Sequence, residues 1–404
     1  MKRKLVLGFV LLCGIGCTYA QDSAAALKPK IELSGTYSIN STALTASFYQ
    51  GLYSGKYLDA TIKDPVGKRI SASNLFGVDA EAKALYYGSQ VFAQWGVYAG
   101  LSYNIDLGAQ FTGDLYRLIF EGNANYADKI ADLSGVQVKY LESQSIHLGV
   151  YRSLPTSAST LSRSIQCGLN FVQGSNWYDI KIDKGSVFTE ANGAYLDITM
   201  KGNMYQADTL KSFNGVGAGL NFSYKVEKKN GRQFLIEASN VGVMQWSKNT
   251  LHNYVDTTFH FDGFQINNIF AIQDSTFSNI NANTVTDNLK SENKAQLMVL
   301  PFTVHANYLH PLNNKMYLTV DLNYKYWSTY IPKLILSYGY KFTNSISAEV
   351  IAGYGGYGQL HAGVNAKISC KDIQVRVGAS DLLGFIAPSS FSNQGAYLMA
   401  SYYF

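Results

Sequence analysis

Residues 395–404, at the end of the chain, read GAYLMASYYF. Alternate side chains of this stretch fall on two sides. One side carries Ala396, Leu398, Ala400, Tyr402 and Phe404, and the other carries Tyr397, Met399, Ser401 and Tyr403. A period of two residues indicates a β-strand whose two faces meet different surroundings. The stretch also has the length of a strand that crosses a bilayer at a tilt, about 9–11 residues.

The same pattern recurs upstream, in residues 314–326, 333–342, 345–355, 359–369 and 372–380. A soluble β-sandwich also alternates, but its strands usually have about 5–6 residues. Aromatic residues gather at the strand ends, as they do in the girdles of membrane barrels. Examples are Tyr326, Trp327, Tyr338, Phe342, Tyr402 and Phe404. The pattern therefore predicts an all-β fold, a transmembrane antiparallel β-barrel.

The beginning of the chain has the features of an export signal. Basic residues 2–4 precede an apolar stretch at 5–16, and small residues follow at 18–20, where a signal peptidase cuts. No other apolar run approaches the roughly 18 residues of a transmembrane helix. We expect a signal peptide at 1–20 and one outer-membrane barrel domain at 21–404.

Cys17 allows a second interpretation of this segment, a lipid-anchored cysteine. Gly14 stands three residues before it, where such a motif has a Leu-like side chain, and this disfavours the anchor. Two cysteines leave with the signal. The remaining pair, Cys167 and Cys370, have neither metal-ligand spacing nor the pattern of a disulfide framework.

Charge gives no indication of a nucleic-acid partner. The signal holds three of the 33 basic residues and no acidic ones, which leaves 30 basic against 28 acidic residues. A nearly neutral chain of mixed signs lacks the basic surface that binds polyanions. We expect no nucleic acid among the partners.

The first half of the chain is less regular. Residues 74–87 and 91–105 alternate well, and 144–153, 163–172 and 31–39 are further candidate strands. If 176–183 and 194–208 also cross the membrane, the barrel has sixteen strands. If they form an external hairpin or loop, it has fourteen. Asp179, Lys181 and Asp183 in the first of these segments favour fourteen.

Residues 112–121 break the strand pattern. Their sequence is TGDLYRLIFE, and Leu115, Leu118 and Ile119 share one helical face. We expect a short amphipathic helix after strand 91–105.

The lengths of the connections predict an orientation. The turns near residues 227–231, 310–313, 343–344 and 370–371 are short and fall at one end of the barrel. The connections 245–297 and 381–394 are long and fall at the other end. Short periplasmic turns and long external loops are the usual asymmetry.

Several segments resemble a known family. The run from Trp95 through the short helix to residues 120–129, and the stretch 215–246 with its glycine-alternating strand, resemble a family of Bacteroidota outer-membrane barrels of unknown function. That family is distantly similar to the long-chain fatty-acid transporter barrels and to the shuttle barrel of the type IX secretion system. The terminal Phe404 resembles the signal read by outer-membrane assembly machinery. The resemblance implies a fold and a location, and it carries over no catalytic or binding residue.

Catalytic and metal sites are not predicted. Six histidines are present, but no serine stands in a GxSxG elbow or in a histidine-bearing motif. His252, Asp256, His260 and Asp262 fall close together in the 245–297 connection, where solvated loop residues are the better interpretation than a catalytic or metal site. Gly215, Gly217 and Gly219 lie within a strand, not at a phosphate-binding turn, and they leave room for a close approach to the barrel wall. We expect no enzyme activity, no cofactor and no metal.

The inward faces of the predicted strands carry charges of both signs. These are Asp321, Lys325, Lys341, Glu349, His361, Lys367 and Arg376. Such a lumen is either a wet channel or a barrel that internal salt bridges close, and both interpretations stay open.

Two functions agree with these patterns. The first is uptake or passage of small, hydrophobic molecules, with the short helix as a plug and outer-membrane lipid around the wall. The second is a barrel that interacts with a secretion or surface-assembly machine, with a protein partner at the 245–297 external loop. A simple diffusion porin ranks third.

Overall fold

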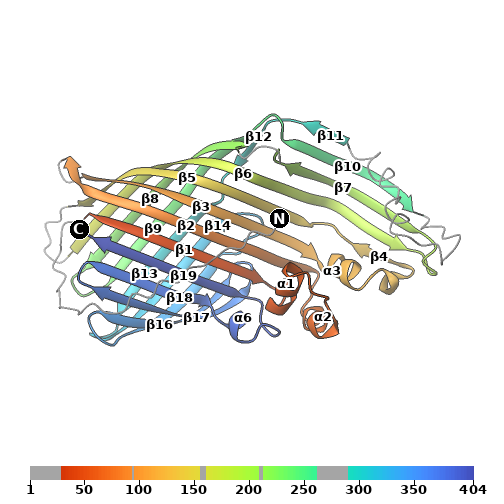
Figure 1. The fold of residues 1–404 in the computed structure, drawn as a ribbon. Coiled ribbons are helices and arrows are strands. Elements are labelled where there is room, and N and C mark those ends of the chain that lie inside the picture. Colours follow the sequence, from red (N-terminus) through yellow and green to blue (C-terminus); the bar gives the residue numbers. More distant parts are fainter. Residues whose placement is uncertain (1–28, 93–94, 155–160, 209–212, 262–289) are drawn as a thin grey trace.

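The computed structural model describes residues 29–92, 95–154, 161–208, 213–261 and 290–404 (Figure 1). Fourteen antiparallel strands form a closed barrel, and the first strand pairs with the last. Closure leaves no free strand edge within the barrel. The barrel strands are β1 (Lys30–Ser41), β2 (Ser73–Phe92), β3 (Trp95–Thr112), β5 (Gln137–Leu154), β6 (Leu161–Thr189), β8 (Gly215–Lys228), β9 (Gln233–Trp246), β13 (Phe302–Pro311), β14 (Met316–Tyr326), β15 (Lys333–Lys341), β16 (Ile346–Gly355), β17 (Gln359–Cys370), β18 (Ile373–Asp381) and β19 (Gln394–Tyr403). The predicted fold class is confirmed.

Part of the same sheet continues beyond the barrel at the end opposite the C-terminus (Figure 1). We call it the outer extension. β6 connects the barrel to the outer extension. The C-terminal part of this 29-residue strand pairs with β4 (Lys129–Asp132) and β7 (Leu196–Gln206). β7 then pairs with β10 (Leu251–Phe261), and β10 pairs with β11 (Lys290–Asn293). A short strand, β12 (Gln296–Val299), returns along β9.

The two segments whose role was open lie in this extension. Residues 176–183 belong to the continuation of β6, and 194–208 contain β7. Neither adds a barrel strand, so the preference for fourteen strands is confirmed. The 245–297 connection is not one irregular loop, because β10, β11 and the start of β12 order most of its described part. Residues 262–289 lie outside the described residues.

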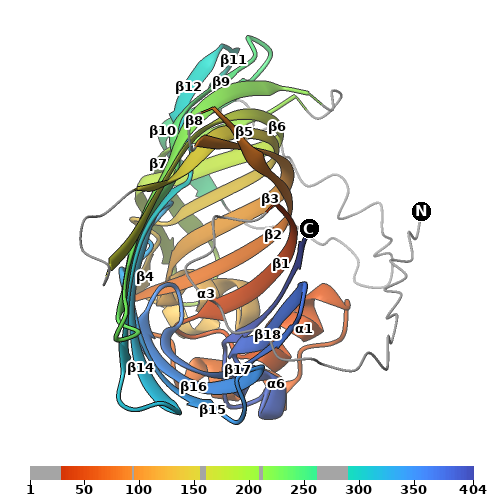
Figure 2. The same ribbon diagram turned by 90° about the vertical axis from the view of Figure 1, so that its left-hand side faces the viewer.

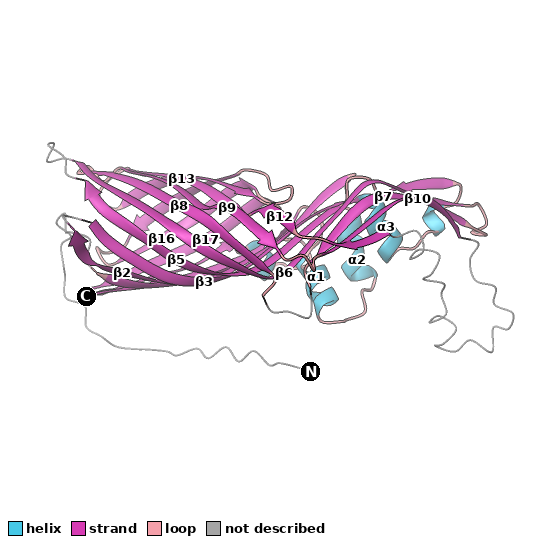
Figure 3. Cartoon of the chain, turned by 90° about the horizontal axis from the view of Figure 1, so that it is seen from above, coloured by secondary structure: helices cyan, strands magenta, loops and turns pink. Residues whose placement is uncertain are grey.

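Short helices occupy the same end as the outer extension (Figure 3). The helix predicted at 112–121 is α3 (Gly113–Phe120), and Thr112 caps it by accepting a hydrogen bond from the Leu115 backbone N–H. Tyr116 of α3 packs with Phe48 and Val66, from α1 (Ala46–Tyr53) and α2 (Ala60–Gly67). Within the described residues, the remaining helices are η1 (Ala124–Tyr126) and α6 (Leu383–Ile386).

Asp114 of α3 fixes this helix to the outer extension. Its carboxylate accepts hydrogen bonds from the Tyr126 hydroxyl at 2.7 Å and from the Asp132 backbone N–H at 2.8 Å. Burial and the bond to Asp114 raise the pKa of Tyr126 to about 12. Tyr126, Leu133 and Val187 form a small apolar core under the helix.

The strand faces divide as the alternation predicts. On β14, Leu318, Val320 and Leu322 point outward and are exposed, whereas Tyr317 and Thr319 point inward and are buried. Figure 2 looks from the end that holds the C-terminus and shows the strands as a ring around a lumen. No helix among the described residues is long and apolar enough to cross a membrane.

Candidate functional site

The inward faces surround a chamber of about 810 Å³. Polar side chains from strands all around the barrel line it. Acidic and basic residues are equally represented, and they are Asp79, Glu81, Lys83, Asp106, Lys225, Asp321, Lys325, Lys333, Glu349 and Arg376. Charges of both signs in a lumen of this size describe a wet chamber.

The structure brings four of the seven predicted lumen residues to the chamber wall, namely Asp321, Lys325, Glu349 and Arg376. The other three lie elsewhere. Lys341 places its ammonium 5.7 Å from the ring centroid of Tyr317, and Lys367 stands opposite Arg376 in the β17–β18 register. His361 is buried near the outer rim, where its ring bonds to Asp381 and to the Gly355 carbonyl.

Lys325 makes an ion pair across the lumen. Its ammonium, on β14, contacts the carboxylates of Asp79 on β2 and Asp106 on β3. The Lys325 and Asp106 side chains are 9% and 14% exposed, so water screens their attraction poorly. Removing one partner of such a buried pair strands a charge, which costs about 3–5 kcal/mol. The pair therefore holds opposite walls together.

Tyr357 makes a second contact across the lumen. It lies in the turn between β16 and β17, and its ring rests on Gly77 and Gly108 of the facing wall. A Cβ at Gly77 would come within 1.9 Å of the ring, and one at Gly108 within 2.2 Å of the hydroxyl. Only glycines leave this space. The Tyr357 hydroxyl also donates to the Trp327 carbonyl at 2.9 Å.

An apolar cluster fills the lumen beside these contacts. Trp177 of β6 and Trp246 of β9 stack with ring centroids 5.2 Å apart at 12°, and Trp327 joins them from the β14–β15 turn. Leu141, Val172, Ala207, Met244 and Leu300 complete the cluster. All these side chains are at most 4% exposed. We call this cluster, the Tyr357 contact and the Lys325 ion pair the outer closure.

The chamber lining shows how the chamber and the outer closure are related. Lys325 of β14 and Tyr330 of the β14–β15 turn line the chamber, whereas Trp327 of that turn and Tyr357 of the β16–β17 turn do not. Wall side chains therefore close the chamber toward the outer end. α3 contributes no side chain to the chamber lining and packs instead against α1 and α2, so its role as a plug stays a prediction.

The inward glycines serve this packing. Gly215 is within reach of Met244 and Trp246, because a Cβ there would lie 2.9 Å from the Met244 sulfur and 3.0 Å from the Trp246 ring. Gly174 admits the same tryptophan. The predicted close approach to the wall is thus made by the chain's own side chains. The run 353–358 ends β16 and forms the turn that carries Tyr357, with Gly356 at a φ of +59°.

Four polar residues of the chamber were missed by the sequence analysis. Ser102, His147, Asn170 and Asn221 lie on four successive barrel strands and bond to one another. Their separation along the chain leaves no local motif. Alternation alone could have placed each of them inward, but it could not show that they meet.

The histidines of the 245–297 connection are ordered in the structure. His252 of β10 stacks on Tyr205 at 4.3 Å between ring centroids and contacts Glu292 at 2.9 Å. His260 pairs with Asp197. The interpretation of these residues as solvated loop residues is therefore wrong for His252, and Asp262 lies outside the described residues. No group of three metal-ligating side chains occurs in the described part of the chain.

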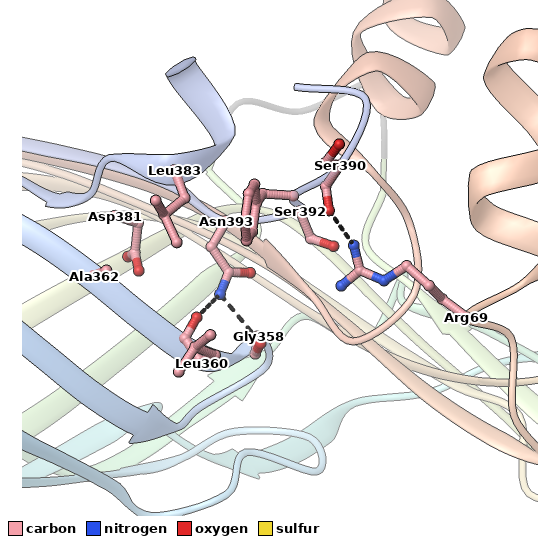
Figure 4. A pocket seen from close by; sticks show the side chains of 10 residues that line it. Arg69, Gly358, Leu360, Ala362, Asp381, Leu383, Ser390, Ser392 and Asn393 are labelled. Atoms are coloured by element: carbon pink, nitrogen blue, oxygen red, sulfur yellow. Dashed lines mark hydrogen bonds between the residues drawn. The ribbon is translucent and has the colours of Figure 1, made fainter. Parts of the chain in front are cut away.

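A second, smaller pocket of about 150 Å³ lies at the outer rim (Figure 4). The Asn393 side chain donates to the carbonyls of Gly358 and Leu360, and Arg69 donates to the Ser390 carbonyl. These bonds take the place of strand pairing where β17 extends past the end of its pairing with β18 at Val364. The pocket therefore belongs to a joint between the wall and the β18–β19 connection.

Solved structures of similar architecture include two toluene transporters and a FadL homologue. The toluene transporter TodX of Pseudomonas putida gives a TM-score of 0.43 at 10% identity, covering 94% of this chain and 91% of that chain. A Pseudomonas aeruginosa FadL homologue gives 0.44 at 9% identity over 94% and 91%, and the Ralstonia pickettii toluene transporter TbuX gives 0.42 at 6% over 93% and 90%. With TM-scores below 0.5, these similarities carry no argument about function.

Sequence comparison gives a firmer result. No curated protein matches the chain. A family model, described as a family of unknown function, matches residues 29–380, which is most of the chain. The resemblance to an uncharacterised barrel family is confirmed, and its assignment to Bacteroidota stays a prediction. The chain belongs to the family of unknown function DUF5723.

Proposed function

We propose that this protein is an outer-membrane barrel that lets small, hydrophobic molecules pass. The outward faces support the location, because apolar residues there are exposed by 39–57% on neighbouring strands. Examples are Leu318, Val320, Val350, Val364 and Leu398. A closed barrel satisfies its own backbone hydrogen bonds, which is the condition for crossing lipid with strands.

The outer closure is the observation that carries the proposal. Lys325, Tyr357 and Trp327 reach across the lumen through side chains alone. These contacts can separate while every strand of the wall keeps its partners. The chamber behind them has room for a small molecule, and its polar lining holds water when no solute is present. A passage gated by side chains follows from this arrangement.

The apolar cluster supports the hydrophobic substrate class. A solute that enters from the outer end meets Trp177, Trp246 and Trp327 before it meets the polar chamber. A hydrophobic molecule replaces the contacts that these rings make with one another. A sugar loses its hydrogen bonds to water there and gains none from the rings in return. The cluster thus discriminates by desolvation.

Uptake by cells that produce the protein tests the passage. We expect Tyr357→Ala to increase the uptake rate of a radiolabelled aromatic hydrocarbon, because it removes the ring from the Gly77 and Gly108 surface. Tyr354→Ala is the matched control, since Tyr354 is an outward tyrosine three residues away and 60% exposed. Equal uptake by cells with and without the protein contradicts the proposal.

A labelled disaccharide tests the substrate class in the same cells. Uptake of the disaccharide without uptake of the hydrocarbon would leave a passage but remove the hydrophobic class. If neither compound enters, and a stoichiometric protein partner is recovered by mild detergent extraction, the interaction barrel replaces the transporter.

Topology is tested on intact cells. In the proposed orientation the outer extension faces the exterior, and the turn after Cys370 faces the periplasm. Added protease should cut within 245–297, and a bulky thiol reagent excluded by the membrane should not label Cys370. If Cys370 is labelled and the protease leaves 245–297 uncut, the orientation is the reverse of the proposed one. The intact mass of the purified protein should correspond to a chain that starts at Gln21 if the predicted signal at 1–20 is removed.

A further inference from the structure

A chain of hydrogen bonds runs along the inner face of the chamber wall from β9 to β3. It begins at Asn240, where β9 contains a bulge and Asn240 has a φ of +64°. Asn221 of β8 and Asn170 of β6 follow, then His147 of β5 and Ser102 of β3. The last three are 3–7% exposed, and all five residues line the chamber.

The direction of each bond follows from the first donor. The Asn240 backbone N–H can only donate, and it lies 2.9 Å from Asn221 Oδ1. This fixes the Asn221 amide, so its Nδ2 donates to Asn170 Oδ1. Asn170 Oδ1 is then an acceptor, and it lies 2.6 Å from His147 Nδ1.

The histidine tautomer is therefore set by the chain. Because Asn170 Oδ1 can only accept, the proton of His147 is on Nδ1. His147 Nε2 is then a free base, and it lies 2.9 Å from Ser102 Oγ, whose hydroxyl donates to it. A nucleophile, a base within hydrogen-bond reach and a third group that orients the base are the parts of a serine hydrolase site.

Two neighbours of Ser102 can stabilise negative charge on a bound carbonyl oxygen. Asn104 Nδ2 lies 3.1 Å from Ser102 Oγ. Lys83 stands directly opposite Ser102 in the β2–β3 register, and its side chain lines the chamber. Backbone N–H groups of these strands are engaged in the sheet, so side chains must supply this stabilisation.

We propose that Ser102 is a nucleophile that hydrolyses small carboxylic esters inside the chamber. Ser102 Oγ attacks the ester carbonyl while His147 Nε2 takes its proton, and His147 returns that proton to the departing alcohol. Water then attacks the acyl-serine, again through His147, which releases the acid and restores Ser102. The proposal depends on passage only in that the ester must reach the chamber.

The strained bulge agrees with this role. Asn240 lies in the left-handed region, which costs free energy for a residue with a side chain. In return it aims a backbone donor at Asn221, from which the orientation of Asn170 and His147 follows. A wall that needs only polar side chains toward water has no use for this backbone conformation.

Labelling by a small alkyl fluorophosphonate tests the proposal on the full-length protein in detergent. Intact mass should show one adduct, and peptide mapping should place it on Ser102. Ser102→Ala should abolish the adduct, and His147→Gln should slow labelling by about a hundredfold or more. Ser145→Ala is the matched control, because Ser145 pairs with Ser102 across β3 and β5, lines the chamber and is 6% exposed.

Access to the chamber is measured separately with the Ser145→Cys variant and a small thiol reagent. If this variant reacts while the fluorophosphonate leaves Ser102 unmodified, the nucleophile is overturned and the passage stands. If the variant does not react either, the chamber is sealed and both proposals fail. An adduct on a serine other than Ser102 also overturns the assignment.

Asn170 acts through His147 and is a positioning residue, so its test is a pH profile. The Asn170→Asp variant places a carboxylate beside His147 Nδ1. The acidic limb of the labelling rate should then move to higher pH, because the carboxylate favours the charged imidazolium. A profile that stays in place while the rate falls would indicate a structural role only.

Discussion

The two halves of the barrel are built from strands of different length. Strands β13 to β19 have 9–12 residues each, which is enough to cross a bilayer at a tilt. β2, β3 and β5 have 18–20 residues and β6 has 29. The short strands end at the rim, whereas β6 continues into the outer extension. The alternating pattern of β6 thus continues from the barrel wall into the outer extension.

A bulge marks the transition between them. On β6, Asn176 pairs with Glu142 and Gly174 pairs with Ser143, so Ser175 is an extra residue. The extra residue moves the inward face from even to odd positions, which keeps Trp177 in the apolar cluster. Strand length and strand number are therefore independent, and a long alternating segment does not count as two crossings.

The largest expected effect comes from placing a charge on the outward face of the barrel and comparing it with a charge on the outer extension. Val364→Arg puts a guanidinium on the outward face of β17, where the residue is 43% exposed. It should lower the free energy of unfolding by about 2–4 kcal/mol if the site is near the bilayer midplane. Thr258→Arg, at an exposed position of β10, should cost about 0.5 kcal/mol or less. Urea unfolding in lipid vesicles measures both.

A second pair of variants checks the strand faces within the barrel. Leu318→Arg should behave like Val364→Arg, whereas Asn365→Arg and Thr319→Arg, on the inward faces of β17 and β14, should be milder. Equal losses at outward and inward positions would show that the barrel wall is not in lipid. A loss at Thr258 as large as that at Val364 would place the outer extension in the bilayer.

The sequence predicted the short strands well because each of them obeys one rule throughout its length. It also favoured fourteen barrel strands over sixteen because of the charges at Asp179, Lys181 and Asp183, and the structure has fourteen. Asp179 pairs with Lys139, and the two side chains are 23% and 27% exposed. A local pattern was sufficient for these features.

The outer closure could not be predicted in this way. Lys325 and Asp79 are separated by 246 residues, and Tyr357 meets glycines from the opposite end of the chain. Contacts across a lumen depend on which strands face each other after closure, and alternation carries no such information. The set of Ser102, His147 and Asn170 depends on the same long-range geometry.

The contact of Tyr357 with the facing wall gives an effect of intermediate size. Gly77→Ala introduces a Cβ within 1.9 Å of the Tyr357 ring, so the turn between β16 and β17 must move. We expect a loss of about 1–3 kcal/mol in the free energy of unfolding. Gly35→Ala on neighbouring β1 is the control, because its Cβ would meet nothing closer than 3.9 Å.

The double variant Gly77→Ala with Tyr357→Ala separates overpacking from backbone strain. Without the ring, the added methyl group has space, and the cost of Gly77→Ala should largely disappear. If the cost persists in the double variant, the two halves of the barrel are not joined by this contact.

The smallest expected effect lies in the outer extension and depends on pH. Glu292 of β11 accepts hydrogen bonds from Lys294 and His252, and these bonds lower the pKa of Glu292. A carboxyl whose pKa is lowered by folding stabilises the folded state above its unfolded pKa, about 4.3, and loses that contribution as the pH falls through the folded value. Acidification below this range should therefore loosen β11 from β10 while the short barrel strands stay protected.

Hydrogen exchange of residues 290–293 measures the change, and Glu292→Gln at each pH corrects for the intrinsic exchange rate. Equal protection of β11 in both proteins from pH 6 to pH 3 would show that the edge of the extension is held by its backbone pairing alone.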